Sequence, residues 1–121
     1  MRFCAEQRLR RQHDFSHVRT EGRRYDCGAF AFFYAPRAAP APIPGARVGV
    51  VASTAAVGDA VRRNRAKRRL REVFRRHQAL VPPGQDVLLV ARRALSRLEY
   101  REIERKFVGA CRTLFPTAPL P

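Results

Sequence analysis

The sequence predicts one α+β domain, residues 1–121, in which helices pack on a small sheet. Three observations lead to this fold class. The strongly basic segment 62–76 carries its apolar residues at helical spacing, and the continuous apolar run 86–91 is typical of a central strand covered on both faces. An amphipathic pattern over 100–114 then indicates a closing helix. A chain of 121 residues is long enough to bury one such core.

The first predicted helix is short. Asp14 can cap a helix that runs from Phe15 to about Glu21 and ends at Gly22. A helix of this length is stable only when its apolar face docks on something, and Phe15 and Val18 share a face. Phe15 can therefore be a core residue or a platform on which RNA bases stack, and the sequence leaves both roles open.

Segment 25–34 is rich in aromatic residues and predicts a strand. One side of this strand carries Phe30, Phe32 and Tyr34, and the other side carries Ala31 and Phe33. Either the strand is buried on both faces, or one aromatic row lines a groove where unpaired bases stack, each worth about 1–3 kcal/mol. The periodicity does not choose between these two arrangements.

The remaining elements follow from local signals. Prolines at about 36–46 predict a stiff surface loop, and 47–53 predicts a second core strand. Gly58 and Asp59 supply the break and the N-cap before the basic helix. The closing helix has a capping-box pattern at Ser96 and Glu99, and a short proline-containing tail, 116–121, ends it.

The basic helix is the candidate functional element. Nine of the fifteen residues in 62–76 are Arg or Lys, and Glu72 is the only acidic one. The apolar residues Ala66, Leu70, Val73 and Phe74 form a single stripe, so this side faces the core and the arginines point away from it. Such uncompensated repulsion between like charges indicates a polyanionic partner.

Composition supports a nucleic-acid partner and argues against a disulfide-rich, zinc-binding, exported or membrane-spanning protein. The formal net charge is +15 and the pI is near 11.6, values typical of proteins that bind phosphates. The three cysteines contain no C-x-x-C pair, so neither a disulfide framework nor a zinc site is indicated. The start of the chain lacks the apolar region of a signal peptide, and no apolar run is long enough to span a membrane. We expect a cytoplasmic protein.

No catalytic constellation is visible. The sequence has no glycine-rich phosphate loop, metalloprotease motif or serine-hydrolase motif. His13 and His17 have the i,i+4 spacing of two metal ligands, but no third ligand lies near them in sequence. The prediction is therefore that the protein has no catalytic residues and no metal site of its own.

Residues 63–75 follow the pattern R-N-R-x-K-R-x-L-R-E-x-F-R, which resembles the signature helix of the bacterial ribonuclease P protein subunit. The resemblance extends over most of the chain, including the opening Arg8-Leu9-Arg10 and the segment Arg47-Val48-Gly49. It implies an αβββαβα sandwich with a small mixed sheet and a left-handed β-α-β crossover (ribosomal protein S5 domain 2-like). Such a crossover departs from the usual right-handed rule.

The resemblance also implies a function. Proteins of this family assist a catalytic RNA subunit in the endonucleolytic removal of the 5′ leader from precursor tRNA, with Mg²⁺ bound mainly by the RNA. The expected partners are the ribonuclease P RNA and the precursor tRNA. The RNA-binding positions carried over or predicted on this helix are Arg63, Asn64, Arg65, Lys67, Arg68, Arg69 and Arg71. The expected leader-binding cleft consists of Phe15, with Phe32 and Tyr34 as further candidates.

At two places this chain departs from the family pattern, so the roles of the family's residues there do not carry over directly. Relatives often carry a lysine pair where this chain has Thr54-Ala55-Ala56, and Arg19 stands where the first helix often has a second aromatic or apolar residue. The alternative function is a structural ribosomal protein that neutralises rRNA. The R-N-R signature together with an aromatic strand favours the ribonuclease P interpretation, because a purely packing protein needs charge more than stacking platforms.

Overall fold

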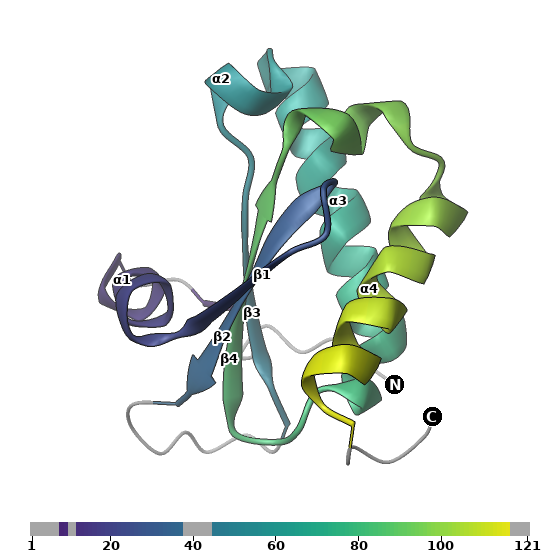
Figure 1. Ribbon diagram of the computed structural model, residues 1–121. Coiled ribbons are helices and arrows are strands. Elements are labelled where there is room, and N and C mark those ends of the chain that lie inside the picture. The colour runs from purple at the N-terminus through teal and green to yellow at the C-terminus, as the bar shows by residue number, and fades with distance from the viewer. Residues whose placement is uncertain (1–7, 10–11, 38–44, 117–121) are drawn as a thin grey trace.

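The computed structural model describes residues 8–9, 12–37 and 45–116, and these form one sheet with helices on both faces (Figure 1). Most of the predicted proline-rich loop and of the tail, and Arg10 of the opening motif, lie outside the described residues. The elements in chain order are α1 (Gln12–Glu21), β1 (Arg23–Asp26), β2 (Phe30–Pro36), β3 (Arg47–Val51), α2 (Thr54–Val57), α3 (Ala60–His77), η2 (Gln78–Leu80), β4 (Gln85–Ala91), η3 (Arg93–Arg97) and α4 (Tyr100–Leu114).

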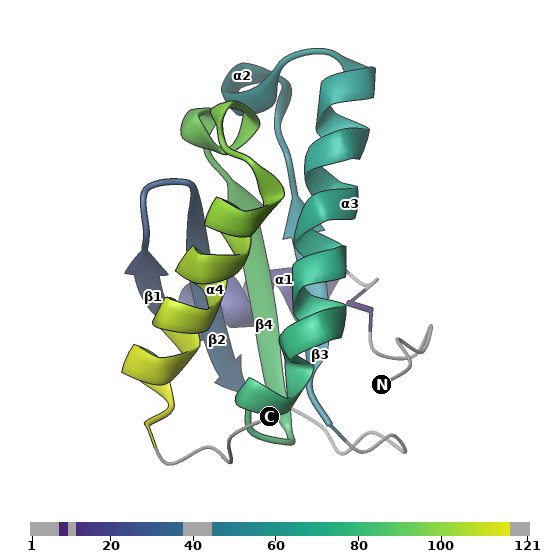
Figure 2. The same cartoon turned by 90° about the vertical axis from the view of Figure 1, so that its right-hand side faces the viewer.

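The sheet has the strand order β1-β2-β4-β3. Strand β2 runs antiparallel to β1 and β4, whereas β3 and β4 are parallel and are joined through α3. In Figure 2, β3 and β4 both run upward, α3 lies in front of them, and β4 lies to the left of β3, so this crossover is left-handed. The mixed α+β sheet and its unusual crossover confirm the fold that the resemblance implied.

Helix α3 follows the sequence prediction closely. Asp59 caps it, because its Oδ1 accepts a hydrogen bond from the backbone N–H of Arg62 at 3.0 Å. The predicted stripe of Ala66, Leu70, Val73 and Phe74 is buried against the sheet and α4. The basic side chains are therefore left on the remaining surface of the helix, as its periodicity predicts.

The aromatic segment is two strands, which corrects the prediction of one strand over 25–34. Strands β1 and β2 form a hairpin with a turn at 27–29. The carboxylate of Asp26 accepts a hydrogen bond from the N–H of Gly28 at 2.8 Å, and Gly28 has a φ of 92°. An aspartate that bonds its own backbone two residues on, followed by a glycine with positive φ, stabilises a tight turn that the run of apolar residues concealed.

Three smaller boundaries also differ. Helix α1 begins at Gln12, so Asp14 lies in its first turn and is not the N-cap. Ser96 belongs to η3 and donates to the carbonyl of Arg93, and the Glu99 side chain makes no capping hydrogen bond, so the predicted capping box is wrong. Strand β3 ends at Val51, two residues before the predicted end, and a short helix that was not predicted, α2, follows it, because Ser53 Oγ accepts from the N–H of Ala56.

The two faces of the sheet bury different amounts of apolar surface. The face under α3 and α4 holds the larger cluster, in which Phe30, Phe32, Phe74 and Phe107 are fully buried. The opposite face, under α1, holds a small cluster made of Leu9, Val18, Ala31, Phe33 and Leu88. The first face therefore provides most of the core, and the second is covered by one short helix (Figure 1).

Candidate nucleic-acid interface

The basic surface of α3 is formed by the predicted residues, but they differ in exposure. Asn64, Arg65 and Arg68 are exposed. The remaining four candidates, Arg63, Lys67, Arg69 and Arg71, are half-buried. Long basic side chains can cover apolar surface with their stems while their charged ends reach solvent, so partial burial is compatible with binding to phosphate.

The charge on α3 is uneven along its length. At the C-terminal end, the Glu72 carboxylate accepts hydrogen bonds from both Arg75 and Arg76, and the bond from Arg75 lowers the pKa of Glu72. Among the described residues, Arg62, Arg65 and Arg68 form no ion pair with any carboxylate. The N-terminal half of α3 thus presents uncompensated positive charge, which favours a polyanion at this end.

The pKa values of two arginines are lowered, although both remain charged at neutral pH. Burial lowers the pKa of Arg69, and the neighbouring Arg65 lowers it further. Burial likewise lowers the pKa of Arg71, with a second contribution from Arg8. Repulsion within these two pairs would be relieved by an anion bound beside them.

A groove lies between α1 and the edge of the sheet at β3. Its pocket has a volume of about 220 Å³ and is lined by Arg8, Leu9, Phe15, Val48, Gly49, Val50 and Arg71. Gly49 is required for the close approach of Phe15, because a Cβ at this position would lie 2.7 Å from Cε1 of the Phe15 ring. Phe15 is half-buried, so one part of its ring packs on β3 and the pocket lies beside it.

Phe32 and Tyr34 do not line this groove, which corrects the prediction that they share a cleft with Phe15. Both lie on the other face of the sheet, where Phe32 is fully buried 5.7 Å from the Phe107 ring and Tyr34 packs at 5.0 Å on Phe115. These distances join ring centroids. Phe33 is the aromatic residue of β2 on the α1 face, and its ring is covered by the guanidinium groups of Arg19 and Arg24.

A buried ion-pair network fastens α1 beside the groove. The Asp86 carboxylate, 1% exposed, accepts two hydrogen bonds from Arg47, at 2.8 and 2.7 Å. Arg37 Nε donates to the same carboxylate at 3.5 Å, and Arg47 Nη2 also lies 3.6 Å from the Asp14 carboxylate of α1. The hydrogen bonds from Arg47 to Asp86 raise the pKa of Arg47. This network connects α1 to β3 and β4 and so contributes to the width of the groove.

Sequence reasoning missed several residues of the two surfaces. Arg8, Gly49 and Arg62 were not among the predicted site residues, although Arg8 and Gly49 belong to motifs that carried the resemblance. A signal for Gly49 existed, because an isolated glycine within a strand often marks a close approach of another group. Arg8 lies far from α3 in sequence, and only the fold brings it to Arg71.

The candidate metal ligands of α1 contact different groups. His13 Nε2 lies 3.7 Å from the Asp14 carboxylate, and His17 Nε2 lies 3.3 Å from the carbonyl oxygen of Pro36. In the described parts of the chain, no three His, Cys, Asp or Glu side chains are grouped as a metal site requires. No helix among the described residues combines the length and hydrophobicity that a membrane crossing requires.

Comparison with known proteins identifies the family. The family model Ribonuclease P matches residues 3–114. A ribonuclease P protein component of Oleidesulfovibrio alaskensis is 44% identical over 88 residues, which cover 73% of this chain and 68% of that protein. The corresponding protein of Desulfovibrio desulfuricans is 36% identical over 109 residues, covering 88% and 82% of the two chains.

Solved structures agree with this result. The ribonuclease P protein from Thermotoga maritima is 28% identical, with a TM-score of 0.74 over 88% of this chain and 96% of that one. The Staphylococcus aureus protein matches with a TM-score of 0.77 over 90% and 95% of the chains, and at 22% identity it supports the fold alone. The family match favours the ribonuclease P interpretation over a structural ribosomal protein. The chain belongs to the bacterial ribonuclease P protein family.

Proposed function

We propose that this protein, as the protein component of a tRNA-processing ribonuclease P, binds the RNA subunit through the basic face of α3. We further propose that it holds the single-stranded 5′ leader of precursor tRNA in the groove between α1 and β3. The RNA-contacting residues would be Arg63, Asn64, Arg65, Lys67, Arg68, Arg69 and Arg71.

The observation that carries the leader proposal is the composition of the groove. Phe15 offers part of an aromatic ring for stacking, while Arg8 and Arg71 supply positive charge at the same pocket. Single-stranded nucleic acid is commonly bound by this combination, because every base has a stacking face and every nucleotide carries a phosphate. The aromatic contact would hold the leader regardless of its sequence, and the arginines would hold its backbone.

The chemistry of bond cleavage is assigned to the RNA subunit. Carboxylates near the two surfaces are already engaged, since Asp59 caps α3, Glu72 pairs with two arginines and Asp14 pairs with Arg47. These residues do not fit a magnesium site on the protein. Mg²⁺ would therefore be bound mainly by the RNA subunit, and the protein would supply positive charge and a binding site for the leader.

Leader binding is tested with Phe15→Ala in the assembled holoenzyme. Loss of stacking should weaken affinity for precursor tRNA by about 1–3 kcal/mol and leave affinity for mature tRNA, which has no leader, nearly unchanged. Affinities are measured for substrates of increasing leader length, with circular dichroism to verify that the variant folds. Equal losses for precursor and mature tRNA in a folded variant would reduce Phe15 to a packing residue.

Magnesium titration tests whether the RNA subunit performs the cleavage and the protein only assists it. The protein alone should leave precursor tRNA intact, and adding it to the RNA subunit should restore cleavage at a lower magnesium concentration. The physical reason is that its positive charge replaces part of the screening between two polyanions. Cleavage by the purified protein without RNA would contradict this assignment.

A further inference from the structure

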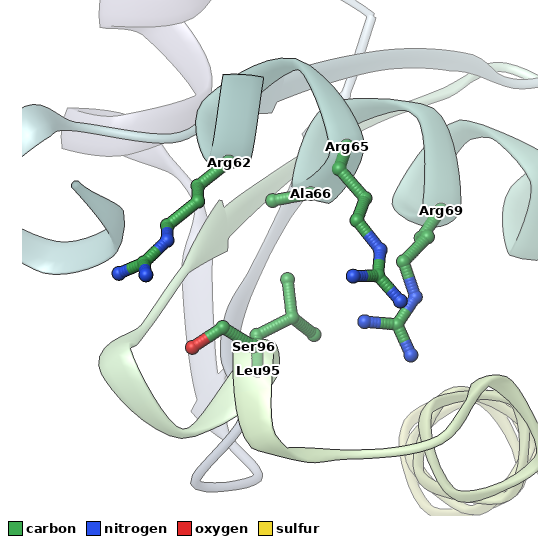
Figure 3. A pocket seen from close by; sticks show the side chains of 6 residues that line it. All are labelled: Arg62, Arg65, Ala66, Arg69, Leu95 and Ser96. Atoms are coloured by element: carbon green, nitrogen blue, oxygen red, sulfur yellow. The ribbon is translucent and has the colours of Figure 1, made fainter. Parts of the chain in front are cut away.

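A second pocket, separate from the Phe15 groove, lies between the N-terminal half of α3 and η3 (Figure 3). Its volume is about 350 Å³, and its lining residues are Arg62, Arg65, Ala66, Arg69, Leu95 and Ser96. None of these residues lines the groove under α1. The two sites therefore use different sides of α3.

The three arginines converge on this pocket because of their spacing. Positions 62, 65 and 69 are separated by three and four residues, which places them on one side of the helix. Figure 3 shows the guanidinium groups of Arg65 and Arg69 side by side, with that of Arg62 on the other side of Ser96. Arg69 is held in place by a hydrogen bond from its Nη2 to the carbonyl oxygen of Leu98.

The charge of this cluster is not neutralised within the described part of the protein. None of the three arginines forms an ion pair with a described carboxylate, whereas Arg75 and Arg76 share Glu72 two turns further along the helix. Burial lowers the pKa of Arg69, and repulsion from the neighbouring Arg65 lowers it further. A bound anion would remove this repulsion.

The floor of the pocket is apolar. Ala66 is 4% exposed and the Leu95 side chain is fully buried, and both lie between the charged groups. A phosphate fits the three arginines, because guanidinium groups pair with phosphate oxygens through parallel hydrogen bonds and the buried apolar floor offers no competing carboxylate.

We propose that this pocket is a subsite for one backbone phosphate of RNA, held between Arg62 and the Arg65–Arg69 pair, above the buried side chains of Ala66 and Leu95. This inference rests on the proposed contact between α3 and RNA, and it adds residues outside the signature helix pattern. Arg62 precedes that pattern, and Ser96 comes from η3, about 30 residues further along the chain.

The decisive variant changes η3 and leaves α3 untouched. Ser96→Asp places a carboxylate opposite the three arginines, where it competes with phosphate, while Thr113→Asp adds the same charge at an exposed site near the end of α4. Ser96→Asp should weaken RNA affinity about tenfold and reduce the slope of log K against log salt by about 0.7–0.9, the share of one phosphate. Thr113→Asp should change affinity less than about twofold.

A second pair tests the phosphate ligand itself. Arg62→Gln should weaken binding and lower the salt slope, and Arg105→Gln, which removes an exposed arginine of α4, should have the smaller effect. Each variant is measured for affinity to the RNA subunit alone and, after assembly, to precursor tRNA, and circular dichroism confirms folding. A loss of affinity for the RNA subunit alone assigns the phosphate to that subunit. A loss of affinity only for precursor tRNA assigns it to the substrate.

The outcomes separate this inference from the proposed function. The pocket would be overturned if Ser96→Asp weakened RNA affinity no more than Thr113→Asp, and Arg62→Gln no more than Arg105→Gln. If the protein still bound the RNA subunit, the basic helix would then remain a general contact. A wild-type protein without affinity for the RNA subunit would overturn the pocket and the proposed function together.

Discussion

The two faces of the sheet differ in what they do with aromatic residues. Under α3 and α4, Phe32 and Phe107 are fully buried and pack against each other. Under α1, Phe15 is only half-buried and lies over Gly49 beside a pocket of about 220 Å³. On the α3/α4 face these rings are completely buried, whereas at the groove a half-buried ring lies over a residue that has no side chain.

This difference separates stability from binding within one small domain. A fully buried aromatic side chain contributes free energy of folding but offers no surface to a ligand. A half-buried ring at a pocket contributes less to folding and can stack on a base. We therefore expect substitutions of fully buried residues on the α3/α4 face to unfold the protein, and substitutions of groove residues on the α1 face to change binding in a protein that still folds.

The largest effect should come from Leu70→Ala on the α3/α4 face. Leu70 is fully buried, so the variant should lose about 2–5 kcal/mol of unfolding free energy through lost burial and the cavity left behind. Chemical denaturation measures this loss. Phe15→Ala serves as the contrasting variant on the other face, and a larger loss of stability in it than in Leu70→Ala would reverse the assignment of the two faces.

Gly49→Ala should disturb the groove more than the core. The new Cβ would lie 2.7 Å from the Phe15 ring, so the ring must move, and leader affinity should fall by up to about 1–3 kcal/mol as stacking is lost. Gly109→Ala in α4 is the matched control, because its Cβ would meet nothing within 4 Å. The control should keep leader affinity and gain roughly 0.5–1 kcal/mol of stability from helix propensity. Similar leader affinities in the two variants would argue against the groove.

Arg68→Ala tests the charged surface that neither face of the sheet buries. Arg68 is exposed and makes no ion pair with a described residue, so stability should change by less than about 0.5 kcal/mol. RNA affinity should fall to a similar extent for RNA with and without a leader, with a weaker salt dependence. A salt titration of binding checks this, and a loss confined to leader-bearing RNA would place Arg68 in the groove instead.

The smallest effect should come from Asp14→Asn, which weakens the link between α1 and Arg47. The atoms are 3.6 Å apart, and Arg47 keeps its two hydrogen bonds to Asp86, so the loss of stability should stay below about 1 kcal/mol. A small decrease in leader affinity at unchanged affinity for the RNA subunit would show that the link sets the position of α1. No change in either affinity would limit Asp14 to a surface charge in the first turn of α1.

The elements with a strong local signal were predicted from the sequence alone. The apolar stripe of α3, its cap at Asp59 and its exposed arginines follow from spacing along one helix. The buried run of β4 was predicted within one residue of its observed start at Gln85, because a strand covered on both faces needs apolar residues at consecutive positions. The proline-rich loop and the tail lie mostly outside the described residues, so their predictions stay predictions.

Some local signals were present but were outweighed by stronger patterns. The Asp26–Gly28 turn was hidden in a run of residues that all favour strands, and the Ser96–Glu99 pattern matched a capping box that α4 does not form. Each motif is defined by a few residues, and the chain on either side decides whether it forms.

Helical spacing was enough to determine the basic face of α3, since the residues that make it are neighbours on one element. The side of β2 that becomes core was decided only by the tertiary structure. Phe32 and Phe33 are equally apolar, and the packing of α3 and α4 on one face and α1 on the other determines which ring is buried where. Tertiary structure also decided that Arg8 lies near Arg71 and that Arg62 and Ser96 line one pocket. Such proximity between distant segments depends on how whole elements pack.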